Sequence, residues 1–136
     1  MELKEKELPA DITVFYVQAE SFREGIPGAF EKLEKIPGGL KGRHVYGITL
    51  CTGDDLIYRA CILENFKGEG EQYGMPVYTI PKGKYLYAAL TNWQNNIDQV
   101  PILFEAFMDQ PNVKKQSICL EDYVSPDEML AMVQLA

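Results

Sequence analysis

The chain has 136 residues, 46% of them hydrophobic and 24% charged, which favours one globular domain with a hydrophobic core. Its formal net charge is −7, with 20 acidic residues against 13 basic ones. This balance argues against direct nucleic-acid binding, which depends on clustered Lys and Arg. No apolar run approaches the roughly 20 residues that cross a bilayer, and the charged N-terminus lacks the apolar centre of a signal peptide. We therefore expect a cytoplasmic protein without membrane contact.

Seven strands and two helices are predicted in chain order. The first ten residues are interpreted as a charged arm, frayed or loosely docked. Segments rich in β-branched and aromatic residues predict strands at 12–20, 43–50, 56–64, 75–80, 84–91, 116–124 and 129–136. Apolar residues at helical spacing predict helices at 26–36 and 98–109. Turns are expected at 52–55 and 125–128, and the glycine-rich segment 65–74 is expected to be an exposed loop.

The predicted order strand–helix–strand–strand occurs twice, at about 11–65 and 83–136, with a linker and short strand at 66–82. The segment AFEKLEKIPG at 29–38 aligns with LFEAFMDQPN at 103–112. The identical pairs are Phe30 with Phe104, Glu31 with Glu105, and Pro37 with Pro111. We therefore expect a single α+β domain over 11–136, built from duplicated β-α-β-β units. Its antiparallel sheet would carry both helices on one face and a ligand cleft between the halves on the other.

Three cysteines and one histidine limit the metal chemistry of this chain. Cys51, Cys61 and Cys119 lack the CxxC spacing of zinc sites and lie in apolar strand segments, so we expect buried, reduced thiols. His44 opens a strand without a Ser or Cys at a recognisable catalytic spacing, which favours an exposed or capping role. The sequence has neither a P-loop nor a dinucleotide-binding glycine pattern. We expect no metal and no cofactor.

The strand at 116–124 carries Glu121, the most informative candidate for chemistry. Because side chains alternate along a strand, Glu121 lies on the face opposite Ile118 and Leu120, which would pack against the helices. In the first unit its position matches Ile48, so the site is acidic in one half only. Burying a carboxylate is unfavourable unless it is paired. Glu121 is therefore interpreted either as a ligand-facing carboxylate or as a solvated glutamate on an open sheet face.

Aromatic residues could complete a site around this carboxylate. Aromatic faces attract cations and flat organic molecules, although strands favour aromatic residues in any case. The candidate ligand-binding residues besides Glu121 are Trp93, Tyr46, Tyr58, Tyr87 and Tyr123.

Four stretches in this order resemble the GyrI-like small-molecule-binding domain family. They are HVYGITL at 44–50, YTIPKGKYLYAAL at 78–90, the amphipathic segment at 98–109, and LEDYVSPDE at 120–128. The resemblance is to a stand-alone version of the effector-binding domain of multidrug-responsive transcription activators, because no helix-turn-helix segment precedes it. It implies two fused units with a pocket between them. It also implies a key acidic residue in the strand after the second helix, which falls on Glu121.

Three functions follow as alternatives. The leading expectation is a non-catalytic protein that binds hydrophobic, aromatic or cationic small molecules, with Glu121 supplying the charge. The resemblance also implies a hydrolase acting on strained aromatic natural products, with Glu121 as general acid or base. A third alternative is a protein-interaction module. Its partner would be DNA gyrase, which some relatives modulate, or a transcription regulator.

Overall fold

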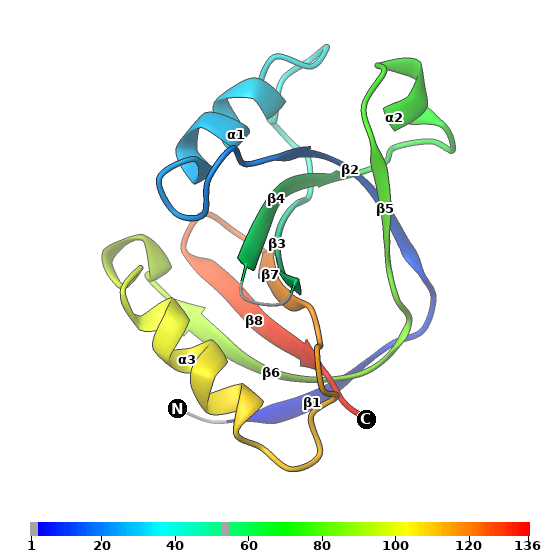
Figure 1. Ribbon diagram of the computed structural model, residues 1–136. Coiled ribbons are helices and arrows are strands. Elements are labelled where there is room, and N and C mark those ends of the chain that lie inside the picture. The colour runs from blue at the N-terminus through cyan, green and yellow to red at the C-terminus, as the bar shows by residue number, and fades with distance from the viewer. Residues whose placement is uncertain (1–2, 53–54) are drawn as a thin grey trace.

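A computed structural model describes residues 3–52 and 55–136, and these form a curled antiparallel sheet with short helices, an α+β arrangement (Figure 1). The strands are β1 (Lys4–Leu8), β2 (Ile12–Gln18), β3 (Val45–Thr52), β4 (Asp55–Leu63), β5 (Val77–Ile80), β6 (Gly83–Thr91), β7 (Cys119–Tyr123) and β8 (Glu128–Gln134). The helices are α1 (Ile26–Leu33), α2 (Glu69–Gln72) and α3 (Gln99–Met108), with a 3₁₀ turn, η1, at Trp93–Asn95. Among the described residues, no helix is long and apolar enough to span a bilayer.

The order of the strands is symmetric about the centre of the sheet. It runs β1-β6-β8-β7-β3-β4-β2-β5. Exchanging β2–α1–β3–β4 with β6–α3–β7–β8, and β1 with β5, reproduces the same order from the other edge. The central pair, β3 and β7, therefore joins two similar halves. This arrangement agrees with two β-α-β-β units, whereas their origin by duplication stays a prediction.

Two segments that were expected to lack structure are ordered elements. The prediction of a frayed arm is wrong for β1, because all five of its residues pair with β6 at the sheet edge. Its alternating Lys and Glu are typical of an edge strand, where charges oppose pairing with other chains. In the predicted loop 65–74, α2 forms and Glu69 is 1% exposed. The predicted turn at 52–55 includes residues 53–54, which lie outside the described residues.

Side-chain alternation gives the sheet two faces with different partners. The inner face, which carries Tyr46, Ile48 and Leu120, is enclosed by the curl of the sheet. Its side chains form one buried cluster with residues of β2, β4, β5, β6 and β8. The outer face carries Gly47 and Glu121, and α1 and α3 pack on it over β4 and β8 respectively (Figure 1). Each helix covers its own half of the sheet.

A buried ion pair attaches α2 to the sheet. Arg43 donates to both carboxylate oxygens of Glu69, at 3.0 and 2.8 Å, and to the carbonyl of Leu63 at 2.9 Å. The backbone N–H of Asn65 donates to the same carboxylate at 2.8 Å. The Arg43 hydrogen bonds hold the pKa of Glu69 below its usual value in spite of burial.

Arg43→Met should destabilise the fold by about 3–5 kcal/mol at neutral pH, because it leaves the Glu69 charge buried without its counter-charge. Urea denaturation measures this loss. Because the folded-state pKa of Glu69 is lowered, the contribution of the pair is present above the ordinary glutamate pKa. It is lost as the pH falls through the folded-state pKa, so the difference from wild type should shrink in acid.

Lys32→Met is the matched control, because the Lys32–Glu20 pair is exposed on both sides. An exposed pair contributes about 0–1 kcal/mol. Equal effects of the two replacements would contradict the structural importance of the Arg43–Glu69 pair.

Candidate functional site

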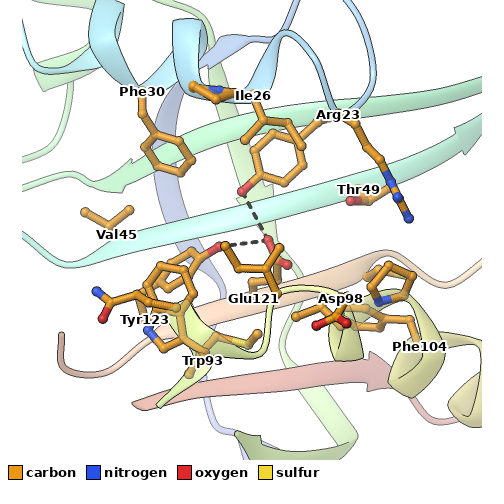
Figure 2. Close-up of a pocket in the computed structure, with 18 of the residues that line it drawn as sticks. Arg23, Ile26, Phe30, Val45, Thr49, Trp93, Asp98, Phe104, Glu121 and Tyr123 are labelled. Atoms are coloured by element: carbon orange, nitrogen blue, oxygen red, sulfur yellow. Dashed lines mark hydrogen bonds between the residues drawn. The ribbon is translucent and has the colours of Figure 1, made fainter. Parts of the chain in front are cut away.

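A cleft of about 1660 Å³ opens on the outer face between α1 and α3. Ile26 and Phe30 of α1 form one wall and Phe104 of α3 forms part of the other (Figure 2). The prediction of a cleft on the face away from the helices is wrong. Each helix covers one half of the outer face, so the central strands remain open between them. Small-molecule pockets usually measure about 300–1,000 Å³, so this cleft has room for a large ligand.

Glu121 lies on β7 at the floor of the cleft. The hydroxyls of Tyr58 and Tyr123 both donate to its Oε1, at 3.1 and 3.0 Å (Figure 2). In the described part of the chain, no Lys, Arg or His side chain forms an ion pair with this carboxylate. Its hydrogen-bond partners are therefore two neutral hydroxyls.

Burial controls the protonation of this group. Burial raises the pKa of Glu121, and the two tyrosine hydrogen bonds oppose the shift only in part. Burial also raises the pKa of Tyr58 and of Tyr123, and the nearby Glu121 charge adds to both shifts. The hydroxyls therefore stay protonated donors at neutral pH, and the carboxyl holds a proton more readily than an exposed glutamate does.

Gly47 of β3 lies directly opposite Glu121 in the β3–β7 pair. A Cβ atom at this position would overlap Glu121 Oε1 and the Tyr58 hydroxyl oxygen. The missing side chain thus provides the space in which the carboxylate and the hydroxyl meet. Gly47 was not among the predicted site residues. Ile48, which the repeat matched with Glu121, lies on the inner face, because a shift of one residue reverses the face of a strand position.

Four of the six predicted ligand-binding residues line the cleft, namely Glu121, Trp93, Tyr58 and Tyr123. The rings of Trp93 and Tyr123 lie 5.0 Å apart. Tyr46 and Tyr87 lie on the inner face and pack against its core, so the expectation that they face the cleft is corrected. Strand alternation turns both of them away from Glu121, and Ile118 and Leu120 likewise pack in the inner core and not under the helices.

The single histidine belongs to the inner face. His44 Nε2 lies 2.6 Å from Asp122 Oδ1, and the ring stacks on Tyr46 with a centroid distance of 4.4 Å. Asp122 follows Glu121 in the chain, but alternation places the two carboxylates on opposite faces. His44 therefore contacts Asp122 on the inner face of the central strands and does not reach the cleft.

The cysteines differ in their surroundings. Cys61 is buried, Cys119 is half-buried, and Cys51 is exposed, so the prediction of burial for all three is wrong for Cys51. Cys51 and Cys119 line the cleft. Burial raises the pKa of Cys119 to about 12, so this thiol stays protonated and weakly nucleophilic.

Other cleft residues were missed by the sequence interpretation. Val45 and Thr49 flank Gly47 on the outer face, and Arg23 and Asp98 line the cleft on opposite sides (Figure 2). The alternation around Gly47 could have indicated Val45 and Thr49 once that glycine was paired with Glu121. Nothing in the local sequence pattern indicates Arg23 or Asp98, which are brought to the cleft by the placement of the helices.

Gly47→Ala should destabilise the protein by roughly 1–3 kcal/mol through overpacking against Tyr58 and Glu121. Gly47 lacks a positive φ, so alanine is compatible with the backbone and the effect isolates the contact. Adding Tyr58→Phe should recover part of the loss, because it removes one overlapping oxygen. Chemical denaturation of the single and double variants gives the coupling.

Gly28→Ala in α1 is the control, because a Cβ there meets nothing within 4 Å. It should stabilise the helix by about 0.5–1 kcal/mol. If Gly47→Ala were as stable as wild type, the close approach at Gly47 would not be a constraint.

Comparison of sequences finds no relative: no family model matches the chain, and no curated protein matches it. Solved structures share the fold. An integron cassette protein from the mobile metagenome of Vibrio cholerae superposes with a TM-score of 0.71 at 16% identity, over 98% of this chain and 95% of that one.

Two further structures superpose over nearly the whole chain. SAV2435, solved bound to tetraphenylphosphonium, has a TM-score of 0.58 and 15% identity, covering 98% of this chain and 94% of its own. A hydrolase from Listeria innocua has a TM-score of 0.54 and 6% identity, covering 99% and 92%. At these identities the likeness concerns the fold alone. The chain therefore shares its α+β fold with proteins that include one solved with a bound small molecule.

Proposed function

We propose that this chain is a GyrI-like domain that binds hydrophobic aromatic cations in the outer-face cleft. The observation that carries the proposal is Glu121 at the floor of an apolar cleft, where no described residue forms an ion pair with its carboxylate. A lipophilic cation supplies both the missing counter-charge and the apolar surface. The binding of tetraphenylphosphonium by SAV2435, which has the same fold, supports this class of ligand.

Aromatic rings surround the carboxylate and suit such a ligand. Phe30 lies 6.2 Å from the ring of Tyr58 and 6.5 Å from that of Tyr123, between centroids. Trp93 adds a third wall beside Tyr123. Ring faces attract cations within about 6 Å, most strongly where water is excluded. We expect the rings to stack on the ligand while Glu121 attracts its charge.

Tetraphenylphosphonium should bind more tightly than triphenylphosphine oxide, a neutral aryl phosphorus compound, because only the cation satisfies Glu121. Glu121→Gln should weaken binding of the cation about ten- to hundredfold, the range expected for loss of an interaction with a charged group worth roughly 1.5–3 kcal/mol. Isothermal titration calorimetry measures the affinity. Quenching of Trp93, the only tryptophan of the chain, gives a second readout.

Glu31→Gln is the matched control, because it removes one negative charge from an exposed position of α1 that does not line the cleft. Its affinity should stay near that of wild type. Retention of full affinity in Glu121→Gln, or equal binding of the neutral compound, would contradict the role proposed for the charge.

A hydrolase is the second candidate, favoured by the raised pKa of Glu121 beside two tyrosine hydroxyls. A carboxyl whose pKa is raised keeps its proton more readily than an exposed glutamate does, which suits general acid catalysis. The test is conversion of a strained aromatic compound in excess over protein. Product beyond one equivalent that is lost in Glu121→Gln supports an enzyme, whereas saturation without product supports a binding protein.

A protein partner such as DNA gyrase or a transcription regulator stays a prediction, as does the cytoplasmic location. Substitutions in the cleft distinguish action through a protein partner from binding of a small molecule. A partner that acts through the acidic surface should be unaffected by Glu121→Gln.

A further inference from the structure

The side chains next to the Glu121 carboxylate on the neighbouring strands carry no charge. On its own strand and on β4, the neighbours are Tyr123, Cys119 and Tyr58, whose pKa values are all raised by burial. On β3, Gly47 and Thr49 carry no charge. The immediate surroundings of the carboxylate therefore contain no fixed positive charge.

The charged residues along the cleft do not change this balance. Arg43 is held in the buried pair with Glu69. Arg23 is exposed beside α1, and no ion pair or hydrogen bond joins it to another described residue. Asp98, which precedes α3, and Glu105 of α3 add two exposed negative groups. Besides Glu121 itself and the paired Arg43, the charged groups along the cleft are therefore one cation and two anions, all exposed to solvent.

Desolvation disfavours the charged form of a half-buried carboxyl that has no counter-charge, so such a group takes up a proton more readily. The geometry leaves a place for that proton. Both tyrosine hydroxyls donate to Oε1 of Glu121, and within the described residues Oε2 has no hydrogen-bond partner. Oε2 is therefore the oxygen available either to a proton or to a ligand.

We propose that the cleft is a proton–cation exchange site, in which a lipophilic monocation binds at Glu121 and one proton leaves the carboxyl for solvent. This inference rests on the proposed function. At pH values below the Glu121 pKa the proton neutralises the carboxyl of the empty cleft, and in the complex the cation does so. The exchange conserves charge, because a neutral acid and a cation yield a carboxylate–cation pair and a free proton.

The raised pKa of Glu121 supports this linkage and fixes its sign. Below that pKa the cation competes with the proton, so its affinity should fall by up to about tenfold for each unit of pH. Above that pKa the carboxyl is already ionised, and affinity becomes independent of pH. A neutral hydrogen-bond acceptor should behave in the opposite way, because only the protonated carboxyl can donate to it from Oε2.

The experiment is titration calorimetry with tetraphenylphosphonium over a series of pH values, each in two buffers of different ionisation enthalpy. The difference between the buffers counts the protons released. Release should approach one proton per ligand at the acidic end and fall towards zero at the alkaline end. Triphenylphosphine oxide, titrated in parallel, should release none and should bind more tightly as the pH falls.

Two variants identify the source of the proton. Glu121→Gln should bind the cation weakly, with no proton release and no pH dependence. His44→Gln removes the only histidine of the chain, which lies outside the cleft. It should release protons as wild type does.

The outcomes separate the two proposals. Binding that depends on Glu121 but releases no proton at any pH overturns the exchange and keeps the proposed function. Equal proton release by wild type and Glu121→Gln overturns Glu121 as the source. Failure of the cation to bind wild type at every pH overturns the proposed function itself, and the exchange with it.

Discussion

The pairing of β3 with β7 is the constraint on which this molecule depends. It is the only strand pair that joins the two halves of the described sheet, and its register places Gly47 opposite Glu121. Because β3 and β7 lie at the centre, α1 and α3 pack over different halves, and the centre of the outer face stays open between them. A shift of one residue would turn Glu121 into the enclosed inner core and remove the site.

The two faces of the sheet divide stability from function. The inner face is filled by a continuous apolar cluster whose buried members come mainly from β2 to β8, with Leu8 of β1 packed against it. The Arg43–Glu69 pair satisfies its own buried charges and holds α2 in place. The inner cluster contains no residue of the cleft floor, and among the described residues the Glu121 carboxylate on the outer face has only hydroxyl partners. A cationic ligand could supply the counter-charge that this carboxylate lacks.

The fold is shared with proteins of very different sequence. Most positions of the fold and of the site tolerate many different residues. The curled sheet and its helices require apolar residues at strand and helix spacing, and many sequences provide this pattern. A ligand that contacts mainly ring faces also places few demands on individual residues. The demands are strict only where atoms nearly touch, as at Gly47, Tyr58 and Glu121. Function in this fold is therefore expected to vary through a few floor positions.

The sequence by itself determined most of the helices and strands and the chemical character of Glu121, because periodicity and residue type are local properties. The predicted helices at 26–36 and 98–109 correspond to α1 and α3, and each long strand appears near its predicted place. Tertiary structure decided the rest. The pairing of β1 with β6, the buried Glu69, and the inward turn of Tyr46 and Tyr87 depend on register and long-range contact. The location of the cleft between the helices also depends on long-range contact. Only the curl of the sheet decides which of its two faces is enclosed.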